Sequence, residues 1–163
     1  MLALVVAGCS RGGDRGNEAA PGGPATASPG GPAAAPVRGC AYITETEASV
    51  VLAQPSRYRR AQSSAQLCTI EPVSGDAFHG TTVSYRVARG NTAQYDFFAA
   101  QKSAQPVSGL GDRALWLAAG GTRGNLVVVT DTNVVSLAIS DFSGRKDLRK
   151  RAEAFAKKVL NRL

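Results

Sequence analysis

Three thiols are the most reactive side chains of this 163-residue chain. Cys9 follows two small residues, Ala7 and Gly8, whereas Cys40 and Cys68 lie in ordinary mixed sequence. A cysteine can be alkylated to a stable thioether, can pair with a second cysteine, or can stay buried as a small apolar side chain. Because the number of cysteines is odd, the three cannot all be paired with one another.

The segment 6–10 reads Val-Ala-Gly-Cys-Ser and resembles a bacterial lipobox, in which an apolar run and two small residues precede a cysteine. The resemblance implies that Cys9 is lipidated, palmitate included, and becomes the first residue of the mature protein. Residues 1–8 would then be a signal-peptide remnant. They contain no Lys or Arg, whereas secretory signals begin with a basic stretch, so we expect the true start to lie upstream. The alternative is a buried free cysteine in a short apolar strand.

An exported lipoprotein uses Cys9 for the lipid and leaves Cys40 and Cys68 as a pair. In an oxidising compartment such a pair persists as a disulfide. The bridge would close a loop of 29 residues, for which the chain-entropy account gives about 3.5 kcal/mol of stabilisation. The alternative is two unpaired, buried cysteines in a cytosolic protein.

Residues 10–39 differ in composition from the rest of the chain. They contain five of the eight prolines and eight of the eighteen glycines, and no large apolar residue before Val37. Such a segment cannot bury enough apolar surface to order itself. We therefore expect 9–39 to be a lipidated cysteine and a disordered tether of about 30 Å. The tether would hold a domain of residues 40–163 away from a membrane.

Periodicity predicts three helices and about five strands in this domain. Thr44 and Glu47 have the spacing of a capping box, and Asn91 or Thr92 can cap a second helix. In that second helix the residues at helical spacing are Ala93, Phe97, Ala100 and Ala104. Strict apolar and polar alternation over 81–88 indicates a strand with one buried face. The expected helices are 45–54, 91–103 and 145–163, and the expected strands are 66–71, 81–88, 114–118, 125–130 and 133–140.

Short turns join the last three strands, which must therefore run antiparallel. The polar and basic segment 56–65 is expected to be a loop. The resulting order, αββ-αβββα, predicts a single α+β domain with an antiparallel sheet and helices mostly on one face. The other face of that sheet would then be open to a partner.

The domain also resembles small uncharacterised envelope lipoprotein domains of high-GC bacteria. The similarity is carried by Cys40 before a capped helix, Cys68 in the next strand, the segment 107–116 (Val-Ser-Gly-Leu-Gly-Asp-Arg-Ala-Leu-Trp) and a basic last helix. That group has no settled activity, so the resemblance implies no catalytic residue.

Positive charge is concentrated in two places. The segment 145–163 carries eight basic and two acidic residues, hence +6 of the net +7. It could lie against anionic lipid, at about 1 kcal/mol per basic residue near the surface, or it could be a solvated helix face. The cluster Arg57, Tyr58, Arg59 and Arg60 could bind an anionic polymer, although so few positions are no nucleic-acid recognition module.

The sequence offers little for catalysis. His79 is the only histidine, and only Asp76 lies near it as a partner. No zinc set remains once two cysteines pair, so we expect no metal, no cofactor and no enzyme activity. The segment 109–112 (Gly-Leu-Gly-Asp) lacks the Lys-Ser/Thr of a phosphate-binding loop and is expected to be a tight turn with positive φ at its glycines. Trp116 is expected in the core or at its rim, and would be a ligand contact if exposed.

These observations predict a lipid-anchored, extracytoplasmic protein of the cell envelope that acts as a protein-binding or accessory module. Its partners would be the membrane, through the lipid, and an envelope protein or anionic surface. An alternative is a sensor or carrier that encloses a small ligand in an apolar cavity between sheet and helix. An envelope hydrolase that uses His79 is a weaker alternative.

Overall fold

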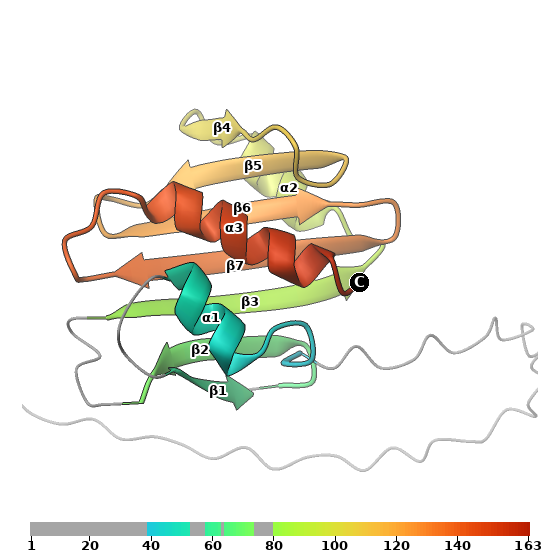
Figure 1. The fold of residues 1–163 in the computed structure, drawn as a ribbon. Coiled ribbons are helices and arrows are strands. Elements are labelled where there is room, and N and C mark those ends of the chain that lie inside the picture. Colours follow the sequence, from blue (N-terminus) through green and yellow to red (C-terminus); the bar gives the residue numbers. More distant parts are fainter. Residues whose placement is uncertain (1–38, 53–57, 63, 74–79) are drawn as a thin grey trace, which may run out of the picture. The chain divides into compact units, whose positions relative to one another are not determined.

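A computed structural model describes residues 39–52, 58–62, 64–73 and 80–163 (Figure 1). Cys9, Arg57, Asp76 and His79 lie outside these ranges, as do the signal remnant and the tether through residue 38. The predictions made for them are therefore neither confirmed nor contradicted by the structure.

One antiparallel sheet of seven strands organises the described residues. Its spatial order is β1-β2-β3-β7-β6-β5-β4, so β3 and β7 lie at its centre and β1 and β4 form its edges. The strands are β1 (Tyr58–Gln62), β2 (Leu67–Pro72), β3 (Thr81–Arg89), β4 (Ala104–Pro106), β5 (Arg113–Ala118), β6 (Arg123–Val129) and β7 (Asn133–Asp141).

Two helices cover one face of the sheet and a third lies on the other. In Figure 1, α1 (Glu45–Leu52) and α3 (Leu148–Leu160) lie in front of the sheet, whereas α2 (Ala93–Ala99) lies behind it. The main apolar core fills the space between the sheet and α1 and α3. A small second cluster of Val127, Val129 and Val134 packs against Tyr95 and Phe98 on the α2 side.

The α+β class, the three helices and the antiparallel sheet are confirmed, but the sheet has seven strands rather than about five. β1 occupies part of the segment predicted to be a loop. The loop was predicted because this segment is polar and basic. In the structure, Nη2 of Arg59 lies 2.6 Å from Oε1 of Glu71 on the neighbouring strand, as suits an edge strand. Tyr58 of the same strand is buried. β4 lies where the second helix was expected to end.

The second helix presents a different face from the one predicted. Phe97, placed on the inner stripe by its spacing, is 63% exposed. Tyr95 and Phe98, three positions apart, make the contact with the small apolar cluster instead. The helix also ends at Ala99, so Ala104 is a strand residue.

Local features at two turns follow the sequence closely. The capping box is formed, because the Glu47 amide donates to the Thr44 hydroxyl (3.2 Å) and the Thr44 amide donates to the Glu47 carboxylate (3.0 Å). The hydrogen bonds that the Thr44 amide and hydroxyl donate to this carboxylate lower the pKa of Glu47. Gly109 and Gly111 both have positive φ, as predicted. A Cβ on Gly111 would lie 2.5 Å from the Val129 carbonyl oxygen, so the turn also requires a close approach there.

A buried charged group joins α3 to the centre of the sheet. Arg151 is 4% exposed and pairs with Asp141 of β7, which is 2% exposed. Its Nη1 donates to the Thr81 hydroxyl of β3 (2.7 Å), and its Nε lies 3.1 Å from Asp147. One basic residue of the last helix thus contributes to the core, where an apolar residue would be expected.

The carboxylate of this pair is held in its charged form. Burial alone would raise the pKa of Asp141, but hydrogen bonds from Ser143 and Arg151 outweigh burial, so this pKa is lowered. A carboxyl group whose pKa is lowered in the folded state stabilises the fold at pH values above its pKa in the unfolded chain, which is about 3.9. That contribution is lost as the pH falls through the folded pKa.

We expect Arg151→Met to lower the free energy of unfolding by about 3–5 kcal/mol, because it leaves Asp141 buried without its partner. Arg162→Gln is the matched control: it breaks an exposed pair with Glu47 (2.8 Å) and should cost at most about 1 kcal/mol. Urea denaturation at neutral pH measures both. Equal losses of unfolding free energy in the two variants would contradict a larger contribution from the buried pair.

Candidate functional site

The candidate site is the part of the sheet that α2 leaves uncovered. With seven residues, α2 spans only about 10 Å. It packs mainly on β5 and β6 and also reaches β7 at Val134 and Ser136. On β3 and β7 the side chains facing this way include Ser84, Arg86, Ser136 and Ala138, since their neighbours Val83, Tyr85 and Leu137 belong to the opposite core. This alternation leaves a polar surface at the middle of the sheet.

Small side chains form the floor of this surface. Ser84 of β3 and Asn125 of β6 are the cross-strand neighbours of Ala138 in β7, and Arg86 is opposite Ser136. Ala138 is exposed although it belongs to a central strand. Central strand positions favour β-branched and aromatic residues that fill the space above the sheet. Serine and alanine leave that space empty.

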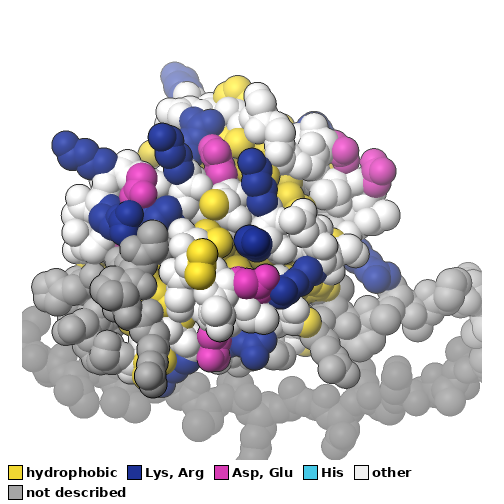
Figure 2. Space-filling model, viewed as in Figure 1, with side chains coloured by type: hydrophobic (Ala, Val, Ile, Leu, Met, Phe, Trp, Pro, Cys, Tyr) yellow, Lys and Arg dark blue, Asp and Glu magenta, His cyan; other side chains and the backbone are white. Residues whose placement is uncertain are grey.

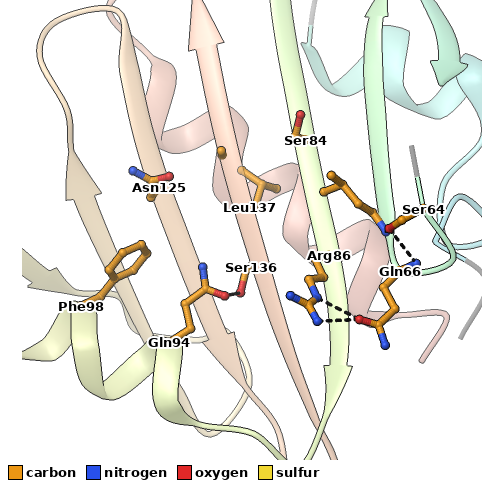
Figure 3. Close-up of a pocket in the computed structure, with 11 residues that line it drawn as sticks. Ser64, Gln66, Ser84, Arg86, Gln94, Phe98, Asn125, Ser136 and Leu137 are labelled. Atoms are coloured by element: carbon orange, nitrogen blue, oxygen red, sulfur yellow. Dashed lines mark hydrogen bonds between the residues drawn. The ribbon is translucent and has the colours of Figure 1, made fainter. Parts of the chain in front are cut away.

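The result is a hollow of about 460 Å³, which we call the sheet groove (Figure 3). One wall is α2 and the other is the turn before β2. Its lining residues are Ser64, Gln66, Leu67, Ser84, Arg86, Gln94, Phe98, Asn125, Ser136, Leu137 and Ala138.

Hydrogen bonds hold both walls to the floor. On the β2 side, the Arg86 guanidinium donates to Gln66 Oε1 from Nε (3.1 Å) and from Nη2 (2.6 Å). On the α2 side, the Ser136 hydroxyl donates to Gln94 Oε1. Ser84 also exchanges a hydrogen bond of 3.0 Å with Thr69. The polar groups of the groove are thus positioned by the sheet and its neighbours before any ligand arrives.

The chemistry of this lining suits binding. Of the described residues that line the groove, Arg86 is the only charged one and none is His, Cys, Asp or Glu, so these residues offer no general base or thiol nucleophile. Among the described residues, no cluster of three or more His, Cys, Asp or Glu could hold a metal ion. Hydroxyls, amides and one guanidinium can instead donate and accept hydrogen bonds to a polar ligand.

The structure places Trp116 away from this site. Trp116 is only 5% exposed and belongs to the main core. A Cβ on Gly124 of the adjacent strand would lie 2.1 Å from its ring, so the indole covers that glycine. The condition for ligand contact, an exposed ring, is not met.

The basic cluster before β2 does not form one surface. Arg59 and Arg60 project from opposite faces of β1, as neighbours on a strand must. Arg59 pairs with Glu71, whereas Arg60 donates to the Cys40 carbonyl oxygen (3.0 Å) and its Nε lies 3.8 Å from Glu45. Both arginines therefore have intramolecular partners, and Arg57 lies outside the described residues.

The two predicted disulfide partners meet in the structure. The sulfur atoms of Cys40 and Cys68 lie 1.98 Å apart, the distance of a disulfide bond. The pair connects the segment before α1 to β2, on the face that α1 and α3 cover. It is thus a staple of the covered face and takes no part in the sheet groove.

Figure 2 shows Lys and Arg side chains on the face of the molecule where α1 and α3 lie. The basic residues of α3 and its flanks divide into two groups by their partners. The arginines have carboxylate partners within 4 Å: Arg145, Arg149, Arg151 and Arg162 pair with Asp147, Glu153, Asp141 and Glu47. The lysines are exposed and form no ion pair within the described ranges: Lys146, Lys150, Lys157 and Lys158. The positive charge available to a partner is therefore that of the lysines.

Sequence reasoning did not single out the residues of the sheet groove. The polar side of β3 was visible in the alternation of Thr82, Ser84 and Arg86, but such a pattern describes any solvated strand face. The more specific signal is two small side chains, Ser136 and Ala138, between the large apolar residues of β7. Which positions neighbour them depends on strand order, which the sequence does not contain.

No protein-family model matches the chain, and neither a curated protein nor a solved structure does. Among the helices of the described segments, none is both long enough and apolar enough to cross a membrane. The functional argument therefore rests on the residues of this chain alone.

A substitution in the floor tests whether the groove is truly unfilled. We expect Ala138→Val to leave the free energy of unfolding unchanged or to raise it by up to about 1 kcal/mol, because a β-branched residue suits an exposed strand position with space above it. The matched control is Ala114→Val in β5, which is 4% exposed on the covered face. Overpacking there should cost about 1–3 kcal/mol. Similar losses at both positions in urea denaturation would contradict the assignment of an open floor.

Proposed function

We propose that this protein is a lipid-anchored, extracytoplasmic binding protein of the bacterial envelope. In this proposal Cys9 carries the lipid, residues 10–39 form the tether and the folded domain presents the sheet groove. The proposal of a binding function rests on the sheet groove. Its described lining residues hold donors and acceptors in place and include no acid–base group and no thiol.

The cysteines support the proposed compartment. Cys40 and Cys68 lie at bonding distance in the structure, and stable disulfides belong to oxidising compartments. With that pair accounted for, Cys9 is the only other cysteine of the chain. Its place after Val-Ala-Gly supports lipidation.

A small-ligand sensor or carrier is the second candidate. The groove volume of about 460 Å³ lies within the range of small-molecule sites, roughly 300–1,000 Å³. A carrier of an apolar ligand, however, needs an enclosed apolar cavity, whereas this groove is open and most of its lining residues are polar. The geometry therefore supports recognition at a surface, of a polar molecule or of part of a larger one.

The exposed lysines of α3 support an additional, weaker role in orientation. They lie on the face opposite the sheet groove, because α3 and α2 occupy opposite sides of the sheet (Figure 1). If they face an anionic bilayer, at about 1 kcal/mol each, the groove points away from the membrane and toward the rest of the envelope.

The intact mass of the protein, expressed from its native upstream region, tests the anchor and the cysteines together. We expect a mature chain that starts at Cys9, is heavier by its lipid, and is lighter by two hydrogens for the Cys40–Cys68 bond. The Cys9→Ser variant should carry no lipid and should leave the membrane fraction. A non-lipidated chain with three free thiols would contradict the proposal.

A further inference from the structure

We infer that the sheet groove binds an acidic glycan, meaning a short run of sugar rings with hydroxyl or acetamido groups and at least one carboxylate. This inference rests on the proposed function, because it names the ligand class of the same groove. Three features of the lining carry it: neutral hydrogen-bonding groups on the floor, an aromatic ring at one side and an uncompensated guanidinium at the other.

The floor matches the hydrogen-bonding pattern of a sugar. Ser84 and Ser136 supply hydroxyls, and Gln94 and Asn125 supply amides. Hydroxyls and amides both donate and accept, as the hydroxyl and acetamido groups around a sugar ring do. The Asn125 side chain makes no hydrogen bond within the described residues, so both ends of its amide are available to a ligand.

Phe98 provides the apolar surface that a sugar ring also needs. Its side chain is half-buried and packs on the small apolar cluster beneath α2. In Figure 3 the ring lies beside Asn125, across the floor from Arg86. The negative face of an aromatic ring attracts the weakly positive C–H groups on one face of a sugar, by the same electrostatics that orient aromatic pairs.

Arg86 selects for negative charge. Its Nε and Nη2 both donate to Gln66 Oε1, a neutral acceptor that fixes the guanidinium without compensating its charge. Its Nη1 makes no hydrogen bond within the described residues, and none of the described residues that line the groove carries a carboxylate. A carboxylate on the ligand would find a positioned, unpaired cation, and guanidinium–carboxylate hydrogen bonds are among the strong ones.

An extended peptide fits this groove less well than a glycan. Peptides commonly bind to sheets as an added strand, which requires a free edge. The groove lies over β3 and β7, whose backbones already pair with β2, with each other and with β6. A peptide there would have to bind through its side chains alone, without the main-chain hydrogen bonds that give strand addition its affinity.

Two matched sugars test the inference. The first is a tetrasaccharide of alternating N-acetylglucosamine and N-acetylmuramic acid with free lactyl carboxylates. The second is the N-acetylglucosamine tetramer, which has the same backbone and no carboxylate. Using the full chain with Cys9→Ser, calorimetry should give about tenfold tighter binding of the acidic sugar.

Variants assign that preference to the groove. Arg86→Gln should bring the two affinities within about twofold of each other. Arg89→Gln removes the same charge from the same strand, but on the face that α1 and α3 cover, and should leave the ratio unchanged. Ala138→Trp should abolish binding of both sugars by filling the floor. Asn125→Ala, a milder change, should weaken both alike.

Several results would overturn the inference: equal affinity for the two sugars, a preference that survives Arg86→Gln, or no binding of either sugar. Tighter binding of a peptide with the sequence of residues 21–35 would also overturn it, because this chain's own tether would then be the occupant. Each of these results leaves the lipid anchor untouched, since the anchor is tested by the mass of the mature protein.

Discussion

The main constraint on this fold is that, within the described residues, one seven-stranded sheet has two faces and three helices to cover them. α1 and α3 cover one face, where apolar side chains from both helices and six strands form the main core. α2 has seven residues and packs mainly on the β5 and β6 side of the other face. The central strands must then expose polar side chains to water on that face. The sheet groove is a direct consequence of this unequal cover.

The covered face depends in turn on a polar interaction. Arg151 enters the core with Asp141 and Thr81, so the position of α3 over β3 and β7 is fixed by directional hydrogen bonds as well as by apolar contact. A buried pair of this kind contributes little net stability compared with apolar residues of similar size. Its geometry specifies which helix face meets which strands, and thereby which face of the sheet stays open.

Local features of this chain were predictable from the sequence, and features that depend on distant neighbours were not. Thr44 and Glu47 predicted the start of α1, and Gly109 and Gly111 predicted a turn. The alternation of apolar and polar residues predicted β3. Each of these features depends on residues that are close in sequence. β1 was missed because its arginines look like a loop until Glu71 is beside them. The groove was missed for the same reason: Ser84, Asn125 and Ala138 become neighbours only when β3, β7 and β6 are placed side by side.

The central claim is that the uncovered face of the sheet is the binding surface. Site-specific photo-crosslinking in intact cells tests it most directly, with a benzophenone side chain at position 138 in the groove or at position 154 on the exposed side of α3. The account predicts an adduct with a glycan or protein of the envelope at 138, and no such adduct at 154, where only membrane lipid would be in reach. An adduct with a glycan or protein at 154 without one at 138 would show that the helical face is the binding surface, and would contradict the account.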